Sequence, residues 1–182
     1  MSEEKKLPLA QRQVANKPKI EDMISEYLDN GMKKLALDSV DFLQANKIQL
    51  RLIVNVSSLF WKAYYKSKVV CALKIAKNSW TVSPINWPLT KCDYSSGYDR
   101  IMNDAKLKKA MWNNISYCKG SNKKDIPVRA SVFGKEFDNV CWMINVNFID
   151  PDADAVECAK IIAEQRCNDI KTAAGIGAEG KG

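Results

Sequence analysis

The stretch FWKAYYKSKVVCALKIAKNSW, residues 60–80, contains five aromatic residues and five lysines but no acidic residue. Three runs of β-forming residues begin in it: Phe60–Lys66, Val69–Ala76 and Trp80–Val82. The turn residues Ser67-Lys68 separate the first two runs. Short strands divided by turn residues predict an antiparallel meander, so this stretch sets the sheet on which the rest of the chain packs.

Upstream of the meander, the pattern is helical. Apolar residues recur at helical spacing over residues 20–28 and again over 35–43, with Asn30-Gly31 between the two runs. This spacing predicts either two consecutive helices or one helix with a break. Leu50, Leu52 and Val54 then alternate with polar residues, which predicts a strand.

Downstream, the sequence predicts one helix over residues 98–115, followed by the loop CKGSNKKDIP. Alternating residues on either side of GKEFDN, residues 134–139, predict a hairpin that ends near Phe148. Asp150 is the expected N-cap of a closing helix, Pro151 its first residue and Lys171 its approximate end.

Strands grouped in runs between helices predict an α+β fold, in which three or four helices cover an antiparallel sheet. The chain has 182 residues, which suits one domain. We expect a mobile arm at 1–18, the domain at 19–172 and a flexible Gly-rich tail at 173–182. The tail contains a match to the dinucleotide-binding glycine pattern, but it follows a helix instead of a strand, so we do not interpret it as a nucleotide site.

Composition excludes several classes of site. The chain has no histidine, so it cannot by itself form a Ser-His-Asp or Cys-His centre. No apolar run has the length of a membrane span or a secretory signal, and we therefore expect a cytoplasmic protein without membrane association. Six cysteines without close pairs predict reduced thiols and lack the ligand spacing of a metal site. We expect neither a metal nor a cofactor.

The charge distribution indicates a binding surface. Residues 47–80 contain seven basic residues and no acidic residue, and the whole chain carries +7. Alternation places Lys62, Tyr64 and Lys66 on one face of the meander, with Lys74 on the neighbouring strand. Such a face suits an anionic group and a ring that stacks on tyrosine. The alternative is a solvated lysine face that prevents pairing with other chains.

Aromatic residues suggest an apolar wall for the same ligand. Candidate members of one shared concavity are Trp61, Tyr65, Trp80 and Trp142. Indole and phenol groups combine a large apolar surface with a polar atom, which suits a pocket. The alternative is an ordinary aromatic core.

Thiol and carboxylate chemistry supply the other hypotheses. Cys118 and Cys92 lie beside lysines, and nearby positive charge favours the thiolate. Both are also members, with Cys141, of a candidate zinc set that lacks close ligand spacing. Glu136 and Asp138 could in principle form an acid/base pair, but carboxylates in a tight turn are far more often explained by turn chemistry and solubility.

These observations favour a non-enzymatic binding module for an anionic or flat aromatic ligand. Its partners would be an anionic small molecule or weakly and non-specifically bound nucleic acid. One alternative is a thiol-dependent enzyme or redox protein that uses Cys118 or Cys92. Another is a protein-interaction domain whose acidic first helix, residues 20–46, meets a basic partner.

Overall fold

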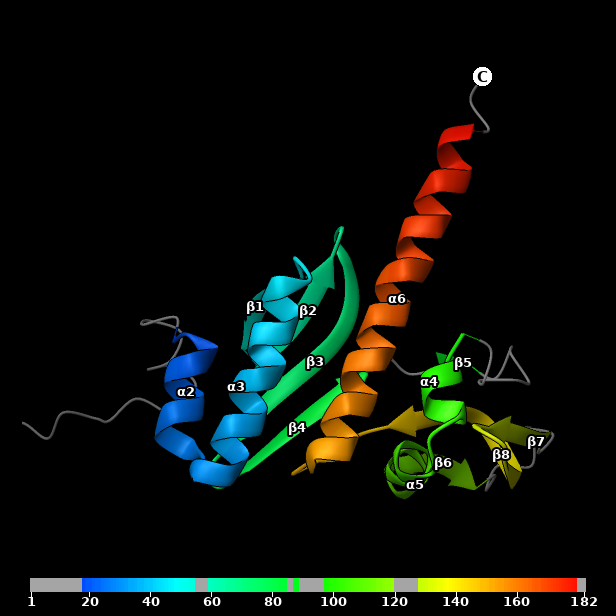
Figure 1. The fold of residues 1–182 in the computed structure, drawn as a ribbon, viewed down its shortest axis with the longest axis horizontal. Helices are drawn as coiled ribbons and strands as arrows, with labels where there is room; N and C mark the ends of the chain where they lie inside the picture. The colour runs from blue at the N-terminus through cyan, green and yellow to red at the C-terminus, as the bar shows by residue number, and fades with distance from the viewer. Residues whose placement is uncertain (1–17, 55–58, 85–86, 89–96, 120–127, 180–182) are drawn as a thin grey trace, which may run out of the picture.

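The computed structural model describes residues 18–54, 59–84, 87–88, 97–119 and 128–179. The elements in chain order are α2 (Ile20–Tyr27), α3 (Asn30–Ala45), β1 (Gln49–Val54), β2 (Leu59–Tyr65), β3 (Lys68–Ala76), β4 (Ser79–Pro84), β5 (Trp87–Pro88), α4 (Asp99–Met102), α5 (Ala105–Asn113), β6 (Ile115–Lys119), β7 (Val128–Val132), β8 (Lys135–Val146), β9 (Phe148–Ile149) and α6 (Ala153–Glu179). This arrangement confirms the α+β prediction (Figure 1).

The meander is the centre of the larger sheet. Its strand order is β1-β2-β3-β4-β9, and every pair is antiparallel. The first turn differs by one residue from the prediction, because Lys66 and Ser67, with φ of 44° and 63°, form it instead of Ser67-Lys68. Two positive φ values match the twist that a tight hairpin turn requires.

The second sheet has the order β5-β8-β6, with β7 also paired to β8. β9 follows β8 after one residue, so this segment runs from the second sheet into the first. The predicted turn at GKEFDN is wrong, since Phe133 and Gly134, with φ of 50° and 76°, make the turn. Glu136 and Asp138 therefore lie on β8, where Asp138 Oδ1 accepts a hydrogen bond from Arg129 Nε at 2.8 Å. Strands β5 and β6 were not predicted.

The two N-terminal helices follow the sequence pattern. α2 ends at Tyr27 and α3 starts at Asn30, so the alternative of two helices is confirmed, with Asn30 and Gly31 inside α3 instead of between the helices. Asp29 is the N-cap of α3, and its Oδ1 accepts a hydrogen bond from the backbone N–H of Met32 at 3.1 Å. A carboxylate at this position satisfies a donor that the first helical turn leaves unpaired.

The single helix predicted over residues 98–115 is wrong, because the segment forms α4, α5 and the start of β6. Asp104 separates the helices: its Oδ1 accepts hydrogen bonds from Lys106 N at 2.7 Å and Leu107 N at 3.2 Å. A side chain that caps α5 in this way starts a new helix inside an apolar pattern that continues through the break.

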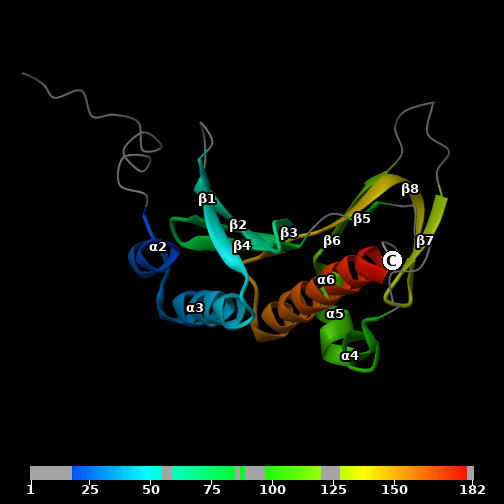
Figure 2. The same ribbon diagram turned by 90° about the horizontal axis from the view of Figure 1, so that it is seen from above.

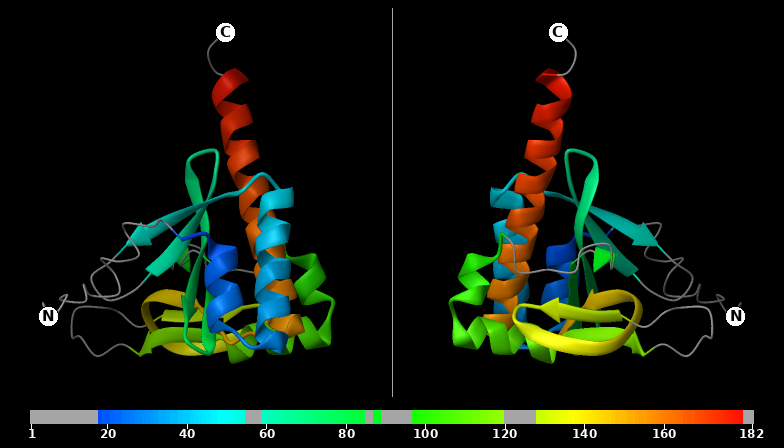
Figure 3. Two further views of the ribbon diagram at one scale, coloured as in Figure 1. Left: turned by 90° about the vertical axis from the view of Figure 1, so that its left-hand side faces the viewer. Right: turned by 90° about the vertical axis from the view of Figure 1, so that its right-hand side faces the viewer.

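The closing helix also starts later and ends later than predicted. Asp152, rather than Asp150, accepts the hydrogen bond of an N-cap, from Ala155 N at 2.8 Å. Asp150 instead bonds β4 through its own backbone and side chain. α6 extends to Glu179, so residues 173–179 are helical, and its C-terminal end projects beyond the sheets (Figure 3).

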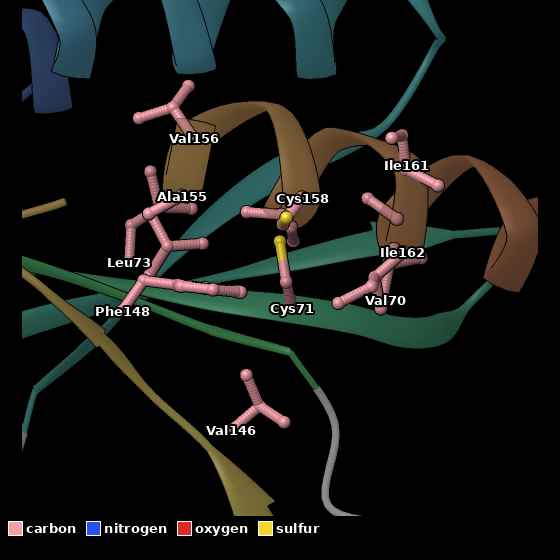
Figure 4. Packing of buried hydrophobic residues seen from close by; sticks show 14 of the residues in the cluster. Val70, Cys71, Leu73, Val146, Phe148, Ala155, Val156, Cys158, Ile161 and Ile162 are labelled. Atoms are coloured by element: carbon pink, nitrogen blue, oxygen red, sulfur yellow. The ribbon is translucent and has the colours of Figure 1, made fainter. Parts of the chain in front are cut away.

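The core lies between the larger sheet and the helices. α2, α3 and α6 lie on one side of this sheet (Figure 2). Figure 4 shows Cys71 of β3 pointing toward α6, with Leu73 and Phe148 near Ala155 and Val156 of that helix. All five of these side chains are buried. Among the described residues, no helix is both long and apolar enough to cross a lipid bilayer.

Candidate functional site on the uncovered sheet face

The larger sheet has one face that α2, α3 and α6 do not cover (Figure 2). The strand registers and the alternation of side chains assign residues to it. We call this surface the uncovered face and define it as Gln49, Arg51, Ile53, Phe60, Lys62, Tyr64, Ala72, Lys74, Thr81, Ser83 and Ile149. It contains three cations and no carboxylate, so its described side chains give it a positive charge.

Arg51 and Lys62 lie opposite each other on β1 and β2. The guanidinium of Arg51 lies 4.7 Å from the centroid of the Tyr64 ring, and its Nη2 donates a hydrogen bond to Gln49 Oε1 at 3.2 Å. Lys62 Nζ lies 5.9 Å from the centroid of the Phe60 ring. Rings attract cations in this arrangement, so both aromatic residues hold positive charge above the sheet.

Lys74 extends the positive charge onto β3, where it lies opposite Phe60. Its side chain is exposed. On the next strands, Thr81 pairs with Lys74 and Ile149 pairs with Thr81. Ile149 is 63% exposed; this end of the face therefore combines an apolar side chain with a cation.

Small and polar side chains occupy the middle of the face. Ala72 lies between Lys62 and Ser83 across the strands, and the Ser83 hydroxyl donates a hydrogen bond to Asn147 Oδ1 at 2.7 Å. The larger side chains of Phe60, Lys62 and Lys74 stand around this position. The middle of the face therefore presents small side chains, with Lys62 on the neighbouring strand and Lys74 two residues along β3.

Lys66 and Tyr65, two other predicted site residues, belong to a separate region. The ammonium groups of Lys66 and Lys171 lie 5.9 Å and 5.8 Å from the centroid of the Tyr65 ring. Tyr65 and Lys171 line a cavity of about 320 Å³ between the end of α3 and α6. The hairpin turn thus places Lys66 at the end of the sheet, away from Arg51.

Trp61 and Trp80, two of the predicted tryptophan residues, do not line the uncovered face. Trp61 and Trp80 are 3% and 1% exposed and belong to the core. Trp61 also lines a cavity of about 670 Å³ beside β1, which differs from the cavity at Tyr65. The side chain of Trp142 lies outside the described part of the chain.

Cys92 and the side chains of Cys118 and Cys141 also lie outside the described part, so the thiol and zinc hypotheses stay predictions. The described thiols are Cys71, Cys158 and Cys167, all buried. Burial raises the pKa of Cys71 to about 12, and burial together with Asp154 raises the pKa of Cys158 to about 12. Burial also raises the pKa of Cys167. These thiols are poor nucleophiles at neutral pH, and the described residues contain no group of three metal-ligating side chains.

Comparison of the chain with protein-family models, with curated protein sequences and with solved structures gives no match. Arg51 and Ser83 are members of the face that the sequence reasoning did not propose. Alternation gives the orientation of each side chain along its own strand. Only the strand pairing places Arg51 opposite Lys62, and Ser83 opposite Ala72, which itself lies opposite Lys62.

Proposed function

We propose that the uncovered face binds an anionic ligand that carries a flat aromatic group, and that it does so without catalysis. The observation that carries this proposal is the position of Lys62 and Lys74 on β2 and β3. Both strands are paired on both sides, so these lysines do not protect a sheet edge from other chains, which is the usual structural use of lysine in strands.

The ligand class follows from the neighbours of these lysines. Phe60 and Tyr64 are half-buried rings whose remaining surface lies beside cations. A ring ligand can stack on them while its negative group contacts Arg51, Lys62 or Lys74. No carboxylate on the described face competes with the ligand for these cations.

Calorimetric titration with adenosine 5′-monophosphate and 1-naphthalenesulfonate tests this proposal. The Lys62→Gln/Lys74→Gln variant should bind both probes at least ten-fold more weakly than the unmodified protein, because two direct charge contacts are lost. A matched Lys34→Gln/Lys109→Gln variant removes the same charge from exposed positions on α3 and α5 and should bind normally. Both variants should keep the melting temperature of the unmodified protein.

Equal affinity of the two double variants would show that net charge, rather than this face, attracts the probes. Absence of binding of both probes by the unmodified protein at millimolar concentration would also reject the proposal. Binding is to be measured at two salt concentrations, since contacts between exposed charges weaken as ionic strength rises.

A further inference from the structure

Cations and rings alternate along β2 on the uncovered face. Phe60, Lys62 and Tyr64 follow one another at two-residue steps, and all three are half-buried. At about 3.3 Å per residue, the two rings are about 13 Å apart along the strand, with the lysine between them. This spacing separates the stacking surfaces by more than the width of one ring.

The cations are also spread across the strands. Arg51, Lys62 and Lys74 come from β1, β2 and β3, respectively, and neighbouring strands are about 4.8 Å apart. Sites for small molecules are usually concave, with polar groups that converge on one point. Here the charges and the rings are distributed over an open sheet, which suits a ligand that repeats its anionic and aromatic groups.

Two of the polar side chains on the face, Arg51 and Ser83, already donate hydrogen bonds to neighbouring side chains. The Arg51 guanidinium is stacked on Tyr64 and bonded to Gln49. The Ser83 hydroxyl is bonded to Asn147. Reading a base requires donors and acceptors directed at the base edge, most often from arginine. The face therefore offers stacking and charge but little sequence recognition.

We infer that the ligand of the uncovered face is single-stranded nucleic acid, whose phosphates contact Arg51, Lys62 and Lys74 and whose bases stack on Phe60 and over the Arg51–Tyr64 pair. This inference rests on the proposed function and names its ligand. Single strands expose ring faces that a duplex keeps stacked inside, and proteins bind them with basic grooves and aromatic platforms. The same face gives a duplex only phosphate contacts, so the duplex binds more weakly.

The test is fluorescence anisotropy with labelled ten-nucleotide strands of deoxythymidine and of deoxyadenosine, and with their annealed duplex, between 50 and 200 mM salt. We expect both single strands to bind with similar affinity and the duplex at least ten-fold more weakly. Three phosphate contacts predict a slope of log affinity against log salt of about −2, at about −0.7 per contact.

Variants separate the charge contacts from stacking. Lys62→Gln and Lys74→Gln should each reduce the steepness of the slope by about 0.7. Phe60→Leu should weaken binding about five-fold or more with the slope unchanged, because a base loses its stacking partner while the phosphates keep theirs. Tyr64→Leu gives the same test if Phe60→Leu fails to fold, and Lys34→Gln on α3 is the control.

The outcomes distinguish this inference from the proposed function. If the mononucleotide and naphthalenesulfonate bind through Lys62 and Lys74 but neither single strand binds, the inference fails and the proposed function stands. If none of these probes binds, both fail. The inference is also overturned if the duplex binds as tightly as the single strands, or if neither Phe60→Leu nor Tyr64→Leu weakens binding. Either result would indicate a general attraction for polyanions such as acidic proteins.

Discussion

Asp150 connects the end of β9 to β4 with an unusual backbone. Its φ is 45°, a left-handed conformation that costs residues with a Cβ about 1 kcal/mol or more. Its backbone N–H donates to Trp80 O at 2.8 Å, and its Oδ1 accepts from Trp80 N, also at 2.8 Å. Both hydrogen bonds hold the chain where it leaves β9 and turns back, so that α6 packs over the sheet.

Replacing Asp150 by alanine should lower the free energy of unfolding by about 2 kcal/mol. The change leaves the backbone N–H of Trp80 without its side-chain acceptor. It also places at position 150 a side chain that does not favour a positive φ. Urea denaturation followed by far-UV circular dichroism measures the effect. Asp150→Asn keeps both the acceptor and the tolerance of this φ, so it should lose much less stability; equal losses in the two variants would contradict this account.

Local sequence predicts which way side chains point along one strand, but it does not predict which residues together form the uncovered face. Alternation along residues 60–66 correctly separates Lys62 and Tyr64 from Trp61 and Tyr65. It does not show that helices cover the tryptophan side, because that depends on contacts with distant residues. Arg51 joins the face only through the register between β1 and β2, which a short apolar pattern does not determine.

At the scale of elements, the sequence predicted the strands and helices whose apolar residues recur with a clear period. It did not predict helix boundaries that depend on a single capping side chain. Asp104 ends a helical pattern that continues on both sides of it. β6 is a short strand whose identity depends on its pairing with β8, a strand that begins at Lys135. Non-local pairing outweighs the weak propensity of so few residues, so no local pattern predicted this strand.

The turn between β2 and β3 is built from residues that do not favour its conformation. Lys66 and Ser67 both have positive φ, whereas a tight turn of this kind favours Asn-Gly. The next turn contrasts with it, because its single positive φ, 57°, belongs to Asn78, a residue that tolerates this region. The first hairpin therefore contains strain that the second avoids.

The Lys66→Asn/Ser67→Gly variant should raise the free energy of unfolding by about 1 kcal/mol, since it relieves two strained residues at a modest cost in the entropy of the unfolded chain. The midpoint of urea denaturation measures this gain. The same variant removes one lysine near Tyr65 but none from the uncovered face, so binding of the anionic probes should stay unchanged. A loss of stability, or a loss of affinity, would show that Lys66 has a role that its position at the turn does not explain.

At the scale of the whole molecule, α6 packs over the larger sheet and encloses thiols between the two layers. Cys71 comes from β3 and Cys158 from α6, with 3% and 0% of their surfaces exposed. The Cys158 thiol also donates a hydrogen bond to the Leu107 carbonyl at 3.3 Å. Burial favours the neutral thiol, which is why the pKa of each rises to about 12.

This packing predicts a loss of stability in alkali. The thiols of the unfolded chain lose their protons near the ordinary pKa of 9.0, while the folded protein keeps them until about pH 12. Between these values the unfolded state binds fewer protons, so the free energy of unfolding falls as pH rises, by up to about 1.4 kcal/mol per pH unit for each thiol. Below pH 9 both states are protonated, and the thiols add no pH dependence.

Urea titrations of the unmodified protein and of a Cys71→Ala/Cys158→Ala variant at pH 8, 9, 10 and 10.5 measure this effect. The variant should be less stable at pH 8, because it loses two buried sulfur atoms, but its stability should fall less steeply above pH 9. Lysine, tyrosine and arginine titrate in both proteins, so the difference between the two curves isolates the thiols. Parallel curves over this range would mean that the thiols ionise as easily in the folded core as in the unfolded chain, contrary to the packing of α6 on β3.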